Sequence, residues 1–213
     1  MITALLFDLD GLLTDTETLH CKAYQLTLAE AGYVLTVEEY FRHWVRAGLG
    51  VADLCRVRPI ARGPRELHDR KAGVFQRLVR EELQAMPGAL GFLERVYGKK
   101  LMGLVTASAK ESADAVLDTL GIRRYFDVVL TADDVVRRKP DPEGFLKAAE
   151  LLGVLPEECV VLEDAERGVI AAHAAGMRVI AVPTEHTRHN DFSRAMHVVS
   201  SLSEISDAWL GIR

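Results

Sequence analysis

Two aspartates near the start of the chain have the side chains best suited to chemistry. Asp8 and Asp10 follow an apolar run that starts at Ile2, and Gly11 comes directly after them. The run predicts a buried parallel strand that ends at the aspartates, because glycine lets the chain turn. In open α/β sheets, ligands bind at the edge formed by the carboxyl ends of the strands. The two carboxylates are either surface acids in a turn or groups that need a cation or a shared proton.

Three more polar positions follow predicted strands further along the chain: Thr106, Lys139 and the pair Glu163-Asp164. Parallel strands end at one edge of a sheet, so these side chains are expected beside the first two aspartates. Taken singly, each has a plainer explanation. A lysine before proline is usually a solvated turn residue, a threonine can belong to a helix start, and an acid pair favours the N-terminus of the next helix.

Helices and strands alternate from Gly88 onward, which predicts an α/β fold with a parallel sheet. Further strands are expected at 101–105, 128–130, 159–162 and 178–182, with an edge strand at 198–199 before a final helix. Helices are expected at 89–97, 108–120, from 142 and at 167–175. Ser108 and Glu111 form a capping-box pattern, and Asp141 is the expected N-cap of the helix that begins with Pro142.

No strand pattern occurs between Asp15 and Pro87, where apolar residues recur at helical spacing. Helices are expected over 17–31, from a capping box at 36–39 and over 66–83, with a loop rich in arginine and proline at 56–65. We therefore divide the chain into an α/β core, 1–14 and 88–213, and an inserted helical subdomain, 15–87. The hinges are expected at 14–16 and 85–88.

The composition indicates a globular protein with one sizeable hydrophobic core and a second, smaller one. The chain has 213 residues, of which 49% are hydrophobic and 27% charged. A net charge of −5 gives no electrostatic reason to expect nucleic acid as a partner. Cys21, Cys55 and Cys159 are odd in number and far apart, which favours a reducing cytoplasm. We expect a cytoplasmic monomer without signal peptide or membrane span.

The polar positions together resemble a known set of motifs. Asp8-Leu9-Asp10-Gly11 with Thr14-Asp15, followed in order by Thr106, Lys139 and Glu163-Asp164, is similar to the four motifs of the haloacid dehalogenase superfamily. The resemblance covers nearly the whole chain and implies a Rossmann-like three-layer core. The helical insertion resembles the cap of the branch that contains phosphoglycolate phosphatase, sugar-phosphate phosphatases and β-phosphoglucomutase. The implied activity is hydrolysis of a small phosphorylated metabolite, a sugar phosphate above all.

The resemblance also implies residue roles. Asp8 matches the nucleophile that forms an aspartyl phosphate, and Asp10 matches the general acid that then acts as the base. The implied cofactor is Mg²⁺, held by Asp8, the backbone carbonyl of Asp10 and Asp164, with Glu163 in support.

Four further residues are implied around the phosphate. Thr106, the backbone N–H of Ala107, Ser108 and the positive end of the following helix suit phosphate oxygens. Lys139 adds a point charge that stabilises the transition state.

The helical insertion is expected to set specificity. His20 and Lys71 occupy places that resemble cap residues of β-phosphoglucomutase used near the hexose and in proton handling. An arginine that holds the distal phosphate in that mutase is replaced here by Val51, which favours hydrolysis. The segment from Arg56 to Lys71 is unusually basic; a solvated helix face is the favoured explanation, and contact with an anionic substrate is the alternative.

Other functions stay open at this point. The second hypothesis is a sugar phosphomutase that uses the same aspartyl phosphate. A haloalkanoate dehalogenase is disfavoured because it needs neither a metal nor a second acid such as Asp10, and the intact acid set disfavours a non-catalytic phosphate-binding module. His186 and His189 have a spacing that suits zinc on a helix, but they lack thiol or carboxylate partners and favour a surface loop. His173 is expected to pack against neighbouring residues or face solvent, and not to take part in chemistry.

Overall fold

The computed structural model describes residues 1–212. The chain forms two compact units, one made of Met1–Asp15 together with the chain from Gln84 onward, and one made of Thr16–Leu83. The first is an α/β unit and the second is a helical unit. No helix among the described residues combines the length and the apolar character needed to cross a bilayer.

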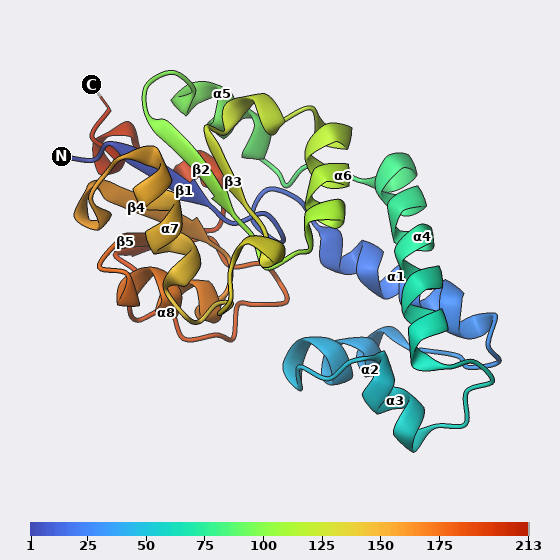
Figure 1. The fold of residues 1–213 in the computed structure, drawn as a ribbon. Coiled ribbons are helices and arrows are strands. Elements are labelled where there is room, and N and C mark those ends of the chain that lie inside the picture. The colour runs from blue at the N-terminus through green and yellow to red at the C-terminus, as the bar shows by residue number, and fades with distance from the viewer. Residues whose placement is uncertain (213) are drawn as a thin grey trace. The chain divides into compact units, whose positions relative to one another are not determined.

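The α/β unit contains one sheet of six parallel strands in the order β3-β2-β1-β4-β5-β6 (Figure 1). The strands are β1 (Ala4–Phe7), β2 (Leu101–Val105), β3 (Val128–Leu130), β4 (Cys159–Glu163), β5 (Arg178–Ala181) and β6 (His197–Val198). β1 is central, because Ala4 aligns with Leu101 on one side and with Cys159 on the other. The first strand of the chain therefore ends between the second and fourth strands.

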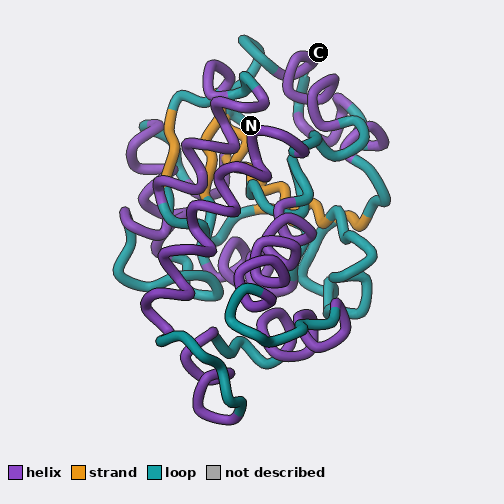
Figure 2. Tube along the Cα trace, turned by 90° about the vertical axis from the view of Figure 1, so that its right-hand side faces the viewer, coloured by secondary structure: helices purple, strands orange, loops and turns teal. Residues whose placement is uncertain are grey.

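Helices cover both faces of this sheet: α5 (Ala89–Val96), α6 (Lys110–Leu120), α7 (Glu143–Leu152) and α8 (Glu166–Ala174). Figure 2 shows the strands flanked by helices. Side chains alternate between faces along a strand. Leu6 of β1 packs in one core cluster with Phe145 of α7 and Val169 of α8. Phe7 points the other way, and its ring lies 6.0 Å from that of Phe92 on α5. The Rossmann-like α/β prediction is confirmed.

The helical unit consists of α1 (Thr16–Ala29), α2 (Val37–Tyr40), a π-helical turn (Phe41–Arg46), α3 (Val51–Val57) and α4 (Pro64–Glu82). Its core contains Tyr24, Leu28, Tyr40, Leu54 and Leu67. The Thr36 hydroxyl accepts a hydrogen bond from the N–H of Glu39, as the predicted cap requires. The expected loop at 56–65 is shorter, because α3 continues to Val57 and proline at the first position opens α4.

The two passages between the units lie side by side in the α/β unit. Thr14 and Ala85 form an isolated antiparallel bridge, and the Thr14 hydroxyl donates to the Gln84 carbonyl at 2.8 Å. The Met86 N–H donates to the Leu13 carbonyl at 2.9 Å. The insertion therefore leaves and re-enters the α/β unit at one place.

Two element predictions differ from the structure. α7 begins at Glu143 with Pro142 at the N-cap, although the Asp141 carboxylate still accepts from the Glu143 N–H at 3.0 Å. The expected final helix is two short 3₁₀ turns, Leu202–Glu204 and Asp207–Leu210. Each turn begins after a serine N-cap, Ser201 or Ser206, so the second cap starts a new turn soon after the first turn ends.

Truncation of Leu6 tests the packing of the α/β unit. Leu6 is 0% exposed, so Leu6→Ala is expected to lower the free energy of unfolding by about 2–5 kcal/mol, through lost burial and a residual cavity. The matched control is Leu146→Ala on α7, whose side chain is 42% exposed, with an expected loss under about 1 kcal/mol. Denaturant unfolding followed by circular dichroism measures both, and equal losses would contradict this packing.

Candidate active site

Asp8 is buried directly after β1 and contacts a lysine from a distant loop. Lys139 Nζ donates to Asp8 Oδ1 at 2.5 Å and to Glu163 Oε1, at the end of β4, at 2.6 Å. The three side chains are each at most 9% exposed. The sheet order explains this, because β1 and β4 are neighbours and both end at the same edge. Lys139 is therefore a buried ion-pair partner and not a solvated turn residue.

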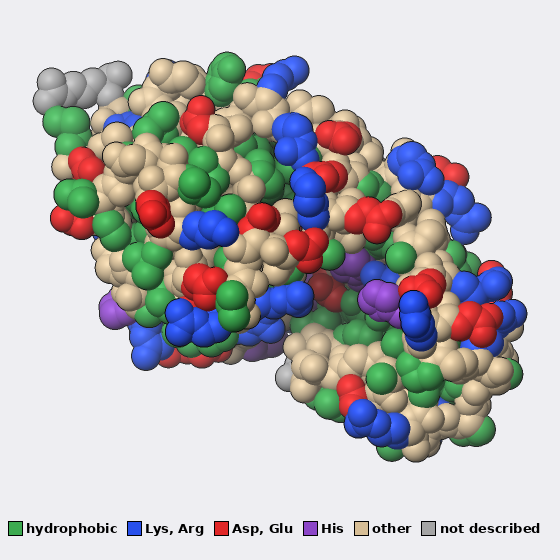
Figure 3. Space-filling view, in the orientation of Figure 1, with side chains coloured by type: hydrophobic (Ala, Val, Ile, Leu, Met, Phe, Trp, Pro, Cys, Tyr) green, Lys and Arg blue, Asp and Glu red, His purple; other side chains and the backbone are tan. Residues whose placement is uncertain are grey.

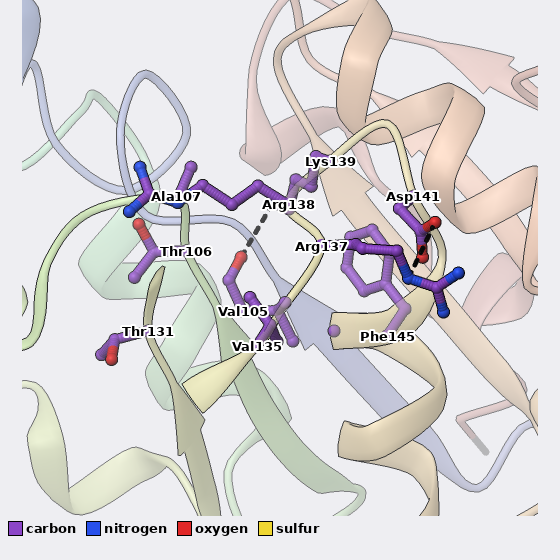
Figure 4. A pocket seen from close by; sticks show the side chains of 11 residues that line it. Val105, Thr106, Ala107, Thr131, Val135, Arg137, Arg138, Lys139, Asp141 and Phe145 are labelled. Carbon is purple, nitrogen blue, oxygen red and sulfur yellow. Dashed lines mark hydrogen bonds and ion pairs between the residues drawn. The ribbon is translucent and has the colours of Figure 1, made fainter. Parts of the chain in front are cut away.

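All three N–H donors of Lys139 have acceptors. The third is the Val105 carbonyl at the end of β2, 2.8 Å from Nζ, marked by a dashed line in Figure 4. Burial by itself would lower the pKa of Lys139, but the charges of Asp8 and Glu163 outweigh it and raise that pKa. Lys139 is thus a fixed positive charge that links the ends of β1, β2 and β4.

Three buried carboxylates converge at this edge. Oxygens of Asp8, Glu163 and Asp164 all lie within 4.8 Å of one another. Burial raises the pKa of Asp8 to about 7, with Lys139 opposing the rise and the neighbouring acids adding to it. Burial, followed by the charges of Glu163 and Asp8, raises the pKa of Asp164 well above its usual range. One lysine does not neutralise the cluster, which favours a bound cation.

Two glycines make room for these carboxylates. A Cβ at Gly11, whose φ is +86°, would lie 2.3 Å from Asp164 Oδ2. A Cβ at Gly168, in the first turn of α8, would lie 1.8 Å from Glu163 Oε1. Sequence reasoning missed Gly168; its only signal was a glycine inside a helix of small residues five positions after Glu163.

Asp10 is held by two hydroxyl groups. The Ser108 and Thr106 hydroxyls both donate to Asp10 Oδ2, at 2.7 and 3.0 Å. The Ser108 N–H donates to Thr106 Oγ1 at 3.0 Å, which fixes the Thr106 side chain. The predicted capping box at Ser108 is wrong, because its hydroxyl is used by Asp10 and α6 begins at Lys110 with Ala109 at the N-cap.

Thr106, Ala107 and Lys139 line one pocket of the α/β unit (Figure 4). Arg137 and Arg138 also line it. Asp8, Asp10, Ser108, Glu163 and Asp164 are not among the residues that line this pocket. Their contacts form two groups at the same sheet edge, one around Lys139 and one around Asp10.

The predicted cap residues pair with each other inside the helical unit. His20 Nδ1 lies 2.6 Å from Lys71 Nζ, and the His20 ring stacks on Phe75 at 3.9 Å. Burial, and then the charge of Lys71, lowers the pKa of His20.

The basic segment of the helical unit is largely neutralised by local acids. Arg56, Arg58, Arg62 and Arg70 pair with Asp53, Glu39, Glu66 and Glu30 respectively. Figure 3 shows basic and acidic side chains next to one another over the face in view. These pairs favour the solvated helix face over an anion-binding surface. His186 and His189 belong to no group of metal-binding side chains among the described residues.

Comparison with known proteins identifies the family of this chain. The family model for haloacid dehalogenase-like hydrolases matches residues 2–176. Fructose-1-phosphate phosphatase YqaB of Escherichia coli is 34% identical over 84% of this chain and 95% of its own length.

Two solved structures match nearly end to end. A putative β-phosphoglucomutase from Thermotoga maritima has a TM-score of 0.84 and 31% identity, covering 100% of both chains. A CbbY variant from Rhodobacter sphaeroides, solved with xylulose-(1,5)bisphosphate, has a TM-score of 0.84 and 30% identity, covering 97% of both chains.

Two glycine substitutions with opposite expected effects on stability test the close contact between the Glu163 carboxylate and Gly168. Gly168→Ala pushes a Cβ into the Glu163 carboxylate and is expected to lower the free energy of unfolding by about 1–3 kcal/mol. Gly91→Ala is the control, since Gly91 lies in α5 with open space at its Cβ. That change should stabilise by about 0.5–1 kcal/mol, because alanine is the better helix former. Denaturant unfolding measures both, and stabilisation by both substitutions would contradict the contact.

Proposed function

The chain belongs to the haloacid dehalogenase-like hydrolases and is a phosphatase, and from this premise we propose that it hydrolyses a small sugar phosphate through an aspartyl phosphate on Asp8. The observation that carries the proposal is the buried Asp8 carboxylate, held by Lys139 beside Asp164. A buried anion of this kind suits nucleophilic attack on phosphorus once a cation offsets the repulsion between the two anions.

The proposed reaction has two balanced displacements. In the first, an Asp8 oxygen bonds to phosphorus, the bond to the leaving oxygen breaks, and Asp10 donates a proton to that oxygen. In the second, Asp10 takes a proton from water as the water oxygen bonds to phosphorus, and the bond to Asp8 breaks. Inorganic phosphate leaves, and both aspartates return to their starting states. Thr106 and Ser108 hold Asp10 through Oδ2 for both transfers.

The carboxylate cluster fits Mg²⁺, which prefers a few carboxylates together with water and phosphate oxygens. Asp8, Asp164 and the Asp10 carbonyl would hold the ion. Glu163 would support the ligands of the ion from nearby. Its Oε1 already accepts from Lys139, and its Oε2 accepts from the Ala165 N–H at 3.3 Å. When bound, the ion neutralises charge on the phosphoryl oxygens.

The residues at the end of β2 suit the phosphoryl group. The Ala107 N–H and the positive end of α6 are the proposed partners of its oxygens, with Thr106 and Ser108 beside them. A sugar phosphate is the proposed substrate class, because one relative is named a fructose-1-phosphate phosphatase and another a phosphorylated carbohydrates phosphatase. All three cysteines are free thiols, which supports action in a reducing cytoplasm.

A sugar phosphomutase is the second candidate. The likeness to a putative β-phosphoglucomutase and the paired His20 and Lys71 favour it. Val51, where we align the mutase arginine, favours hydrolysis, because a bisphosphate intermediate must be held at both ends as it reorients.

A panel of phosphate esters tests the proposal. The wild-type protein with Mg²⁺ is expected to release inorganic phosphate from one or more sugar phosphates, and Asp8→Asn should lose at least about three orders of magnitude in rate. The control is Asp118→Asn, whose side chain is 71% exposed and whose rate should be unchanged. Conversion of glucose 1-phosphate to glucose 6-phosphate without phosphate release would replace the phosphatase with the mutase. Full activity in Asp8→Asn would contradict both.

The carboxylate cluster also predicts how pH affects the metal. The pKa of Asp8 is raised from 3.8 to about 7, so the stability that its protonated form contributes to the metal-free protein is lost as pH rises through 7. Mg²⁺ binds the ionised carboxylates and must displace protons at low pH. Mg²⁺ should therefore raise the thermal unfolding midpoint more at pH 8 than at pH 5. Calorimetry with Mg²⁺ or with EDTA checks this, and an equal rise at both pH values would contradict it.

A further inference from the structure

The donors predicted for the phosphoryl group are already in use. Lys139 has three N–H groups, and Asp8, Glu163 and the Val105 carbonyl accept them at 2.5, 2.6 and 2.8 Å. Thr106 has one hydroxyl hydrogen, and it is directed to Asp10 Oδ2 at 3.0 Å. Each of these two side chains would have to exchange a present acceptor in order to bind an arriving phosphoryl group.

The charge at the site also favours a further positively charged donor for the phosphoryl group. Asp8, Asp10, Glu163 and Asp164 bring four carboxyl groups to this edge, and the charge of Lys139 is shared between two of them. A phosphate monoester adds a charge of about −1.5 to −2 near neutral pH. Even with a divalent cation bound, this arrangement favours another positive group beside the phosphoryl oxygens.

Two adjacent arginines differ in how they are neutralised. Arg137 pairs with Asp141 and with Glu143, so its guanidinium is held at the start of α7. Arg138 is exposed, and among residues 1–212 no carboxylate pairs with it. Its backbone is fixed nonetheless, because its carbonyl accepts from the Asp141 N–H at 3.0 Å. The backbone from which this unpaired side chain extends therefore has a defined position.

Arg138 lines the same pocket as Thr106, Ala107 and Lys139. In Figure 4 the Arg138 side chain extends across the pocket toward the side where Ala107 is labelled, whereas Arg137 points away toward Asp141. We propose that Arg138 binds the phosphoryl group of the substrate, beside the backbone of Ala107. This inference rests on the proposed phosphatase function and adds a charged side-chain donor to the backbone N–H of Ala107.

The chemistry of a guanidinium suits this task. Its N–H donors form a planar fork that can bind two phosphate oxygens together, and it keeps its charge at any working pH. Lysine would provide the charge without the fork. Two substitutions separate the contribution of the positive charge from that of the fork of donors. Arg138→Gln removes both, and Arg138→Lys keeps only the charge.

Binding of inorganic phosphate is the direct test, with titration calorimetry of the whole protein in the presence of Mg²⁺. Arg138→Gln is expected to weaken phosphate binding about tenfold or more, and Arg138→Lys is expected to fall between Arg138→Gln and the wild type. The matched control is Arg137→Gln, which removes the neighbouring paired arginine and should leave phosphate binding within about twofold of the wild type. Thermal unfolding midpoints of the three variants, expected to match the wild type, show that each is folded.

Equal phosphate affinity in the wild type and Arg138→Gln would overturn the proposal, and so would an equal loss in Arg137→Gln. Absence of phosphate binding to the wild-type protein would overturn it as well. Turnover of the ester panel decides the proposed function separately. A protein that binds phosphate through Arg138 but hydrolyses no ester would keep this inference and refute the phosphatase.

Discussion

The structure depends on one unequal electrostatic arrangement, in which several carboxylates share a single buried lysine. Lys139 is saturated by Asp8, Glu163 and a backbone carbonyl, so it ties three strand ends together and has no N–H left for a ligand. Asp164 is buried beside them, and burial, followed by the charges of Glu163 and Asp8, raises its pKa. Such a site favours binding of cations, and with them of anions that coordinate them.

The fold produces this arrangement from residues far apart in sequence. β1 lies between its neighbours β2 and β4, so Asp8, Thr106 and Glu163 lie at the same edge of the sheet. Glycines at 11 and 168 then permit carboxylates to lie against the backbone. The helical insertion departs from the α/β unit and returns to it at one place, where Thr14 and Ala85 pair.

Most of the α/β unit could be predicted because parallel strands and helices leave strong periodic and capping signals. The convergence of Asp8, Lys139, Glu163 and Asp164 could be predicted because each follows a predicted parallel strand and because together they resemble an ordered set of family motifs. Side-chain partners could not be predicted in this way. The Ser108 pattern suited a capping box, but a carboxylate 98 positions earlier competes for the same hydroxyl. Gly168 and Arg138 were missed for a related reason, since their importance lies in what surrounds them.

The central claim is that Asp8 takes the phosphoryl group before water does. The stereochemical course at phosphorus tests it most directly, with a sugar phosphate whose phosphorus is made chiral by oxygen isotopes or sulfur. Two in-line displacements through Asp8 predict retention of configuration in the released phosphate. Inversion would mean that water attacks the substrate in one step, and it would contradict the account.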